Sequence, residues 1–248
     1  MPLALLAIGS VLDVKKYEVI IIDGRIDDTP LITIEKHLDQ AICLGLSVLT
    51  GSPIQDALSI TNKVKELRKE LPIIWGGWHT SLFPLQTLED EKNIDITVQG
   101  QGEQTFKELI EAISENKPYS EIKGICYRDN KGAALKNPPR SIIAMDTFAN
   151  INYNLIDVEK CFEKKGRRQL DYISSTGCFF RCSFCADPFV YNRKWTAISP
   201  DLMVNKLEEL YLKYKFTDLN LQDETYFTYR ERVIEISEKI IEKDLIFS

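Results

Sequence analysis

Short apolar runs alternate with segments of helical periodicity over the first 117 residues, and this pattern limits the folds that the chain can adopt. The runs cover residues 17–23, 41–49, 72–77 and 94–100. Continuous apolar runs of this length are typical of parallel strands that are buried on both faces. We therefore predict strands that alternate with helices in a doubly wound, Rossmann-like α/β sheet. After the second run, one helix face is expected to turn inward: Ala57, Ile60, Val64, Leu67 and Leu71.

The pattern changes between residues 118 and 168 and then resumes. Residues 124–132 predict a hairpin with an Asp-Asn-Lys-Gly turn, and an irregular linker begins at Asn137. Further strands are predicted at 170–174 and 218–221, and a helix at 229–243. A second helix is predicted to begin at Pro200, with these residues facing inward: Leu202, Leu207, Leu210 and Tyr214.

The two ends of the chain indicate a fragment. It opens in an apolar helical segment, residues 3–14, with no strand ahead of it. It stops at residues 245–248, where another strand is expected to start.

Composition excludes several classes of protein. The 31 basic residues are interspersed with 37 acidic ones for a net charge of −6, which argues against a nucleic-acid partner. No apolar run approaches the roughly 18 residues that a membrane span requires. Six cysteines are too few for a disulfide-stapled secreted domain, so we expect a cytoplasmic protein.

Three of those cysteines are crowded into one loop and form the strongest functional signal. Cys178, Cys182 and Cys185 follow a CxxxCxxC spacing, so their thiolates can converge on one metal centre. A [4Fe–4S] cluster normally takes four cysteine ligands. Three ligands leave one iron open, and an open iron can chelate a small molecule and pass it an electron.

Other interpretations of the loop stay open. The cysteines could be buried structural residues. A zinc site would need a fourth ligand, for which the candidates are Cys161, His37 and His79, none of them at a typical zinc spacing. A simple electron carrier would have a fourth cysteine soon after Cys185, where the chain has Ala-Asp-Pro.

The loop resembles that of the radical S-adenosylmethionine (SAM) superfamily. The resemblance rests on the CxxxCxxC spacing, on Phe184 before the last cysteine, and on the position after the first strand of a βα barrel. It implies that the open iron binds the amino and carboxylate groups of SAM, with Phe184 near the adenine. Reductive cleavage then yields methionine and a 5′-deoxyadenosyl radical. Asp223 or Glu224 is implied as a contact to the SAM amino group, although helix N-capping by Asp223 or Thr225 is an alternative.

Three segments of the first half resemble the cobalamin-binding fold of methionine synthase and related mutases. Residues 45–50 resemble its G-L-S-x-L strand, which implies that Ser47 and Leu49 lie at the channel for the cobalamin nucleotide tail. In residues 73–80, Gly76 and Gly77 are implied to let the tail approach the backbone. Residues 95–104 resemble a glycine-rich turn ahead of a helix. The loop that carries a cobalt-ligating histidine would precede Met1, and His79 is interpreted as a hydrogen-bonding residue.

Together these patterns predict an α/β protein in three parts. Residues 1–117 form a Rossmann-like cobalamin-binding domain, 118–168 a hairpin and linker, and 169–248 the start of a radical SAM partial (βα) barrel. The resemblance is strongest to the group that contains anaerobic magnesium-protoporphyrin ester cyclase and radical SAM methyltransferases.

That resemblance implies three cofactors: a [4Fe–4S] cluster, SAM and cobalamin. It also implies a small-molecule substrate, methylated, cyclised or rearranged at an unactivated carbon, and an external one-electron reductant. The alternatives are a radical SAM enzyme without cobalamin and a non-catalytic iron–sulfur or zinc module. The sequence does not specify the substrate.

Overall fold

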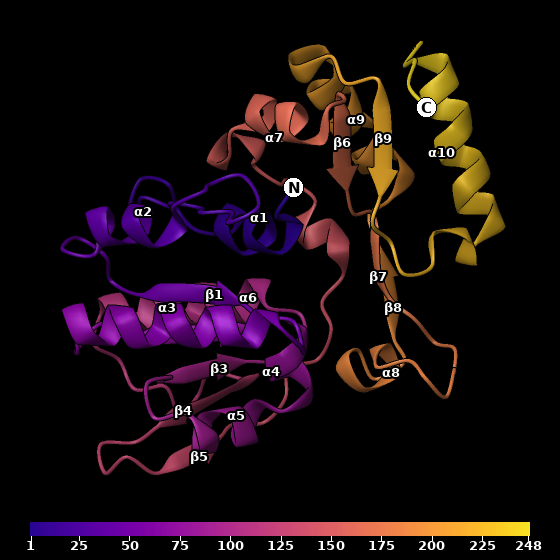
Figure 1. Ribbon diagram of the computed structural model, residues 1–248. Helices are drawn as coiled ribbons and strands as arrows, with labels where there is room; N and C mark the ends of the chain where they lie inside the picture. The colour runs from indigo at the N-terminus through magenta and orange to yellow at the C-terminus, as the bar shows by residue number, and fades with distance from the viewer. The chain divides into compact units, whose positions relative to one another are not determined.

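The computed structural model describes all 248 residues, which pack into two compact units (Figure 1). The sheet unit comprises Ile22–Ser141, and the cysteine unit comprises Met1–Ile21 together with Ile142–Ser248. The three-part functional division at residues 117 and 168 stays a prediction. No helix combines the length and the apolar character that a bilayer span requires.

The sheet unit is built on five strands in the order β1-β2-β3-β4-β5. The first three are parallel: β1 (Leu44–Ser47), β2 (Ile73–Gly76) and β3 (Ile96–Val98). The apolar side chains of β2 and β3 are buried, as expected for parallel strands covered on both faces. The predicted parallel α/β sheet is therefore confirmed.

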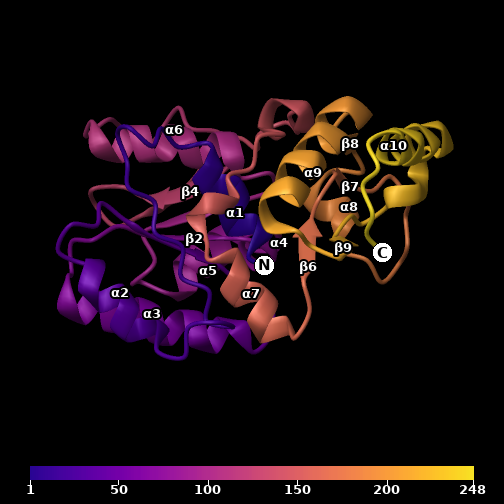
Figure 2. The same cartoon turned by 90° about the horizontal axis from the view of Figure 1, so that it is seen from above.

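Helices cover both faces of this sheet. They are α2 (Pro30–His37), α3 (Pro53–Leu67), α4 (Trp78–Leu82), α5 (Pro84–Asp90) and α6 (Glu103–Ser114). Figure 2 shows α3 and α6 on opposite faces. On the α3 face, the buried indole Nε1 of Trp75 donates a hydrogen bond to Thr61 Oγ1 at 2.9 Å. Leu67, which was expected to face inward, is 52% exposed because α3 ends at this residue.

The predicted hairpin is confirmed, and it extends the same sheet. Strands β4 (Ile125–Arg128) and β5 (Ala134–Lys136) are antiparallel, and β4 pairs with β3. The Asp129 carboxylate accepts hydrogen bonds from the backbone N–H groups of Lys131 and Ala133, and Gly132 takes a positive φ of 81°. These contacts explain why Asp-Asn-Lys-Gly forms the turn.

The prediction of a strand at residues 17–23 is wrong. This segment has no strand assignment, and β1 pairs only with β2. An apolar run becomes a strand only when a neighbour supplies its hydrogen bonds, and this run has no such neighbour.

The cysteine unit contains two small sheets. Parallel strands β6 (Gln169–Tyr172) and β9 (Asp218–Leu221) are joined through α9 (Pro200–Tyr214), and β7 (Ser175–Gly177) pairs antiparallel with β8 (Trp195–Ala197). The predicted strand at 170–174 therefore ends earlier, at Tyr172. The remaining elements are α1 (Leu3–Ser10), η1 (Met145–Phe148), η2 (Tyr153–Leu155), α7 (Val158–Lys165), α8 (Asp187–Val190), η3 (Tyr226–Thr228) and α10 (Arg230–Glu242).

Helix α9 buries one face, as its periodicity predicts. Leu207 and Leu210 are buried as expected, together with Met203 and Val204. Leu202, which was expected to face inward, is 42% exposed. The prediction therefore fails only in the first turn, where Met203 and Val204 are buried in place of Leu202, while Tyr214 is buried as predicted.

Candidate functional site

The cysteine loop connects the two strands of the β7–β8 hairpin. Cys178 follows β7 directly, and Gly177 pairs with Trp195 at the start of β8. Gly177 has a φ of +80°, and a methyl group built on it would lie 2.1 Å from the backbone oxygen of Lys194. Only glycine fits here, because both the positive φ and the close approach of the returning chain exclude a side chain. The base of the loop is therefore narrow.

The three thiols lie in the loop without disulfide bonds. Cys182 is exposed, Cys178 and Cys185 are half-buried, and the backbone N–H of Cys185 donates to the Cys182 oxygen at 3.1 Å. No group of three or more His, Cys, Asp or Glu side chains is arranged to hold a metal ion, so the three thiols do not converge on one point in this structure. The donor set still fits an iron–sulfur cluster, because three soft sulfur ligands share one accessible loop. The Phe184 side chain is 91% exposed beside them.

Two adjacent carboxylates after β9 have different environments. Asp223 accepts hydrogen bonds from Ser174 N (2.7 Å), Ser174 Oγ (2.6 Å) and Ser175 Oγ (2.5 Å), so both of its oxygens are engaged. It caps no helix, and neither does the side chain of Thr225, which donates to the Gly177 oxygen at 3.2 Å. The sequence left Asp223 and Glu224 as equal candidates, and their contacts now distinguish them.

The Glu224 carboxylate is contacted by backbone N–H groups and not by the serines that bind Asp223. Desolvation by the surrounding protein raises its pKa to about 7, although much of the residue's surface is exposed. The nearby carboxylates of Asp187 and Asp223 contribute to this rise, whereas hydrogen bonds from the backbone N–H groups of Glu224 and Gly177 oppose it. The carboxylate of Glu224 therefore lies beside Gly177, at the residue that precedes Cys178.

Asp187 belongs to this site and was not singled out from the sequence. It begins α8, two residues after Cys185, and is 3% exposed. Both of its carboxylate oxygens are buried without a hydrogen-bond partner, and burial raises its pKa. The available signal was an acidic residue directly before Pro188, but that pattern also begins ordinary helices.

A second candidate region lies where β1 and β2 end. Ser47 and Gly76 are paired in the register, and the Ser47 and Leu49 side chains are exposed there. A methyl group built at Gly76 would meet nothing closer than the Leu46 oxygen at 4.0 Å, so this glycine leaves open space. The strand ends thus offer a surface that fits an extended ligand lying against the backbone.

Gly77 has a structural role that the sequence interpretation did not anticipate. Its φ is +93°, and a methyl group on it would lie 2.9 Å from both the nitrogen and the oxygen of Val48. The backbone of Val48, the residue that follows β1, occupies this space, so Gly77 is needed for the two strand ends to approach each other. Of the paired glycines, Gly76 is the one that leaves room for a ligand.

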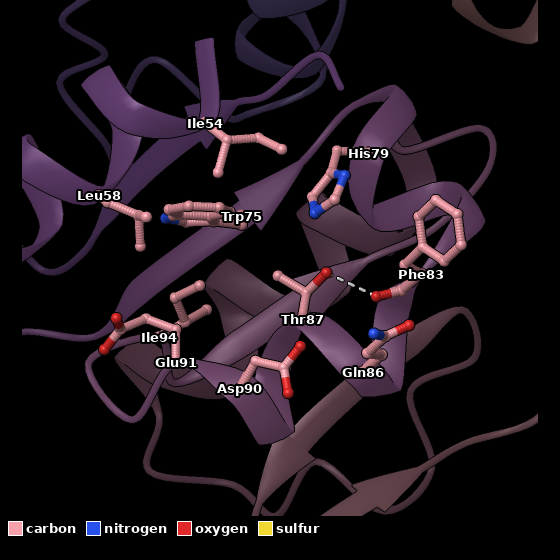
Figure 3. Close-up of a pocket in the computed structure, with 10 residues that line it drawn as sticks. All are labelled: Ile54, Leu58, Trp75, His79, Phe83, Gln86, Thr87, Asp90, Glu91 and Ile94. Carbon is pink, nitrogen blue, oxygen red and sulfur yellow. Dashed lines mark hydrogen bonds between the residues drawn. The ribbon is translucent and has the colours of Figure 1, made fainter. Parts of the chain in front are cut away.

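His79 lies close after these glycines, contacts the chain at the end of β1, and lines a cavity. Its backbone N–H donates to the Val48 oxygen at 3.0 Å, and its Nδ1 lies 3.2 Å from Thr50 Oγ1. Burial lowers its pKa, so the ring stays neutral near pH 7. The cavity has a volume of about 350 Å³, and Figure 3 shows that its lining includes Trp75 and His79 together with the acidic residues Asp90 and Glu91.

The glycine-rich turn before α6 is partly as expected. Gly100 has a φ of +70°, and its N–H donates a hydrogen bond to Ser81 Oγ at 3.0 Å. Gly102 has an ordinary φ of −89°. One glycine of this segment, and not both, provides the positive-φ turn.

Comparison with known proteins assigns the class of the first half. Residues 1–110 match the family model of the B12 binding domain. The chain is 29% identical over its whole length to an uncharacterized methyltransferase of Pyrococcus horikoshii, of which it covers 54%. It is 26% identical, over 98% of its length, to the anaerobic magnesium-protoporphyrin IX monomethyl ester cyclase of Synechocystis, of which it covers 49%. Together these matches support a cobalamin-binding radical SAM family for the chain.

Solved structures share the fold. The cobalamin-dependent SAM radical enzyme OxsB matches 98% of the chain with a TM-score of 0.81 at 22% identity, and the chain covers 35% of it. The radical SAM methyltransferase TsrM of Kitasatospora setae matches 97% with a TM-score of 0.77 at 19% identity, and the chain covers 47% of it. The chain spans about half the length of the curated relatives it matches.

Proposed function

We propose that this chain carries the cofactor-binding portion of a cobalamin-dependent radical SAM enzyme. The observation that carries the proposal is a single loop with three thiols, closed at its base by Gly177 and adjoined by the Glu224 carboxylate. Three thiolates suit a [4Fe–4S] cluster that keeps one iron open for SAM. When bound, the cluster would supply the electron that cleaves SAM reductively to a 5′-deoxyadenosyl radical. Cobalamin would supply the methyl group for transfer.

The residues of the cysteine unit bind and orient SAM in this proposal. Cys178, Cys182 and Cys185 hold the cluster. The Glu224 carboxylate accepts a hydrogen bond from the SAM amino group. This contact is favourable because a positive charge offsets the cost of desolvating the carboxylate. Phe184 provides an exposed ring against which the adenine can pack.

The sheet unit holds cobalamin in the same proposal. The nucleotide tail lies along the open backbone at Gly76, beside Ser47 and Leu49. The B12 binding domain match over residues 1–110 supports this assignment. The work of the protein is then to present two cofactors to one substrate.

The remaining parts of the proposal are the substrate, the reductant and the compartment. Relatives named as methyltransferases and as a ring-forming cyclase support an organic small molecule that is methylated, cyclised or rearranged at carbon. Reductive cleavage requires an external one-electron donor. Three thiols without disulfide bonds suit a reducing compartment such as the cytoplasm.

The test is reconstitution of the chain with iron and sulfide in the absence of oxygen. We expect about four irons and four sulfides per chain. The triple variant Cys178→Ala, Cys182→Ala, Cys185→Ala is expected to lose them, whereas the control Cys43→Ala, in the sheet unit, retains them. Hydroxocobalamin added in parallel should remain bound through gel filtration and show its corrinoid absorption. One zinc per chain, or unchanged iron in the triple variant, contradicts the proposal.

A further inference from the structure

A hydrogen-bonded network lies beneath the cysteine loop. We call Ser174, Asp223 and Arg232 the loop-base network. Ser174 is fully buried, between β6 and β7. Its N–H and its hydroxyl both donate to Asp223, at 2.7 and 2.6 Å. The start of β7 is therefore tied to the residue that precedes Glu224.

Arg232 contacts both sides of the hairpin base. It lies in the first turn of α10, and its Nη2 donates to Ser174 O and Ser174 Oγ, each at 3.1 Å. The same nitrogen donates to Ile198 O at 3.0 Å, and Nε does so at 3.2 Å. Because Ser174 precedes β7 and Ile198 follows β8, one guanidinium fixes the two ends of the segment that carries the thiols.

Aromatic rings enclose the same guanidinium. Its centre lies 5.9 Å from the Trp195 ring and 5.8 Å from the Tyr226 ring. Burial lowers the pKa of Arg232, and Asp223 is the first of the neighbouring anions that oppose this shift. The Ser174 hydroxyl links the two charged groups, because it accepts a hydrogen bond from Arg232 and donates one to Asp223. The opposite charges of Arg232 and Asp223 therefore compensate each other.

Stability of the fold alone does not require the charged pair of Arg232 and Asp223 at this position. A buried charge pair is costly to desolvate, and apolar residues of similar size often stabilise a core equally well. Charged, directional contacts do, however, fix positions. Here they fix two points relative to each other: the hairpin base that leads into Cys178 and the backbone that carries Glu224.

We propose that Ser174, Asp223 and Arg232 are positioning residues that set the placement of the cysteine loop relative to the Glu224 carboxylate, and so the placement of SAM on the cluster. The inference rests on the proposed function. It removes Asp223 from direct contact with SAM and leaves that contact to Glu224. Placement matters because a shift of about 1 Å in a reacting group can cost on the order of 100-fold in rate.

The experiment uses the full chain, reconstituted with iron and sulfide without oxygen, in wild-type, Ser174→Ala and Arg232→Met forms. Arg230→Met is the matched control, because Arg230 is exposed on the same helix. Four quantities are measured: iron per chain, the thermal midpoint, SAM affinity, and the change that SAM causes in the electron paramagnetic resonance spectrum of the reduced cluster.

We expect both network variants to retain iron but to bind SAM about ten-fold more weakly, since the contact to the misplaced carboxylate is lost. Their SAM-induced spectral change, expressed per cluster, should be smaller than in wild-type protein and in Arg230→Met. If Arg232→Met fails to fold, Ser174→Ala decides the question, because it removes one hydroxyl and leaves both charged groups.

Two outcomes overturn the inference. One is an unchanged SAM affinity and spectrum in the network variants. The other is a parallel loss of iron and thermal midpoint with an unchanged spectral response per cluster, which a purely structural role produces. Wild-type protein that holds no iron contradicts the proposed function instead, and the inference falls with it.

Discussion

Gly177 provides the sharpest test of the loop geometry. Replacement by alanine places a methyl group 2.1 Å from the Lys194 oxygen, a separation that no relaxed structure tolerates. The positive φ of 80° costs alanine about 1 kcal/mol, and the displacement of the returning chain adds roughly 1–3 kcal/mol. We therefore expect the Gly177→Ala variant to lose about 2–4 kcal/mol of unfolding free energy.

Gly166 supplies the matched control within the same unit. It also has a positive φ, +67°, but a methyl group built there meets nothing within 4 Å. Gly166→Ala therefore has the conformational cost without the collision, about 1 kcal/mol. The difference between the two variants isolates the close approach of the chain at the loop base.

Urea unfolding, followed by circular dichroism, measures both variants. The linear dependence of the unfolding free energy on urea gives the two differences from wild type. If Gly177→Ala is destabilised no more than Gly166→Ala, the hairpin base is wider than the structure has it, and the reasoning is refuted. Iron content after reconstitution should fall in Gly177→Ala alone.

Four further substitutions test other parts of the molecule. Thr61→Val leaves the buried Trp75 indole N–H without its acceptor, and we expect a loss of about 1–3 kcal/mol in urea unfolding. The Glu224 pKa is raised to about 7 in the folded state, so the folded protein binds more protons than the unfolded chain between about pH 4.5 and pH 7. Glu224 therefore contributes a stability that is present at low pH and is lost as pH rises through 7. We expect the Glu224→Gln variant to show a smaller fall in unfolding free energy over this pH range. An unchanged fall contradicts the assignment. Gly77→Ala should lower stability through collision with the Val48 backbone, whereas Gly76→Ala should keep stability and weaken corrinoid binding, as measured by absorption after gel filtration.

Local sequence patterns were sufficient for most helices and strands. The run at 218–221 is β9, and Pro200 begins α9 as predicted. Such elements follow from the spacing of apolar residues and from residues with fixed backbone preferences, which act over a few positions. The exception was the run at 17–23, because a strand depends on a partner that local sequence does not contain.

The sequence by itself also determined the three sulfur donors of the candidate site, because cysteines within eight residues of one another are neighbours in any fold. Only the tertiary structure separated Asp223 from Glu224, since the serines that engage Asp223 lie 48 and 49 positions away. Likewise, it alone showed that Gly77 lies against the Val48 backbone while Gly76 faces open space. The physical reason is that adjacent residues of the same type differ only in what long-range packing brings against them, and no local pattern records this.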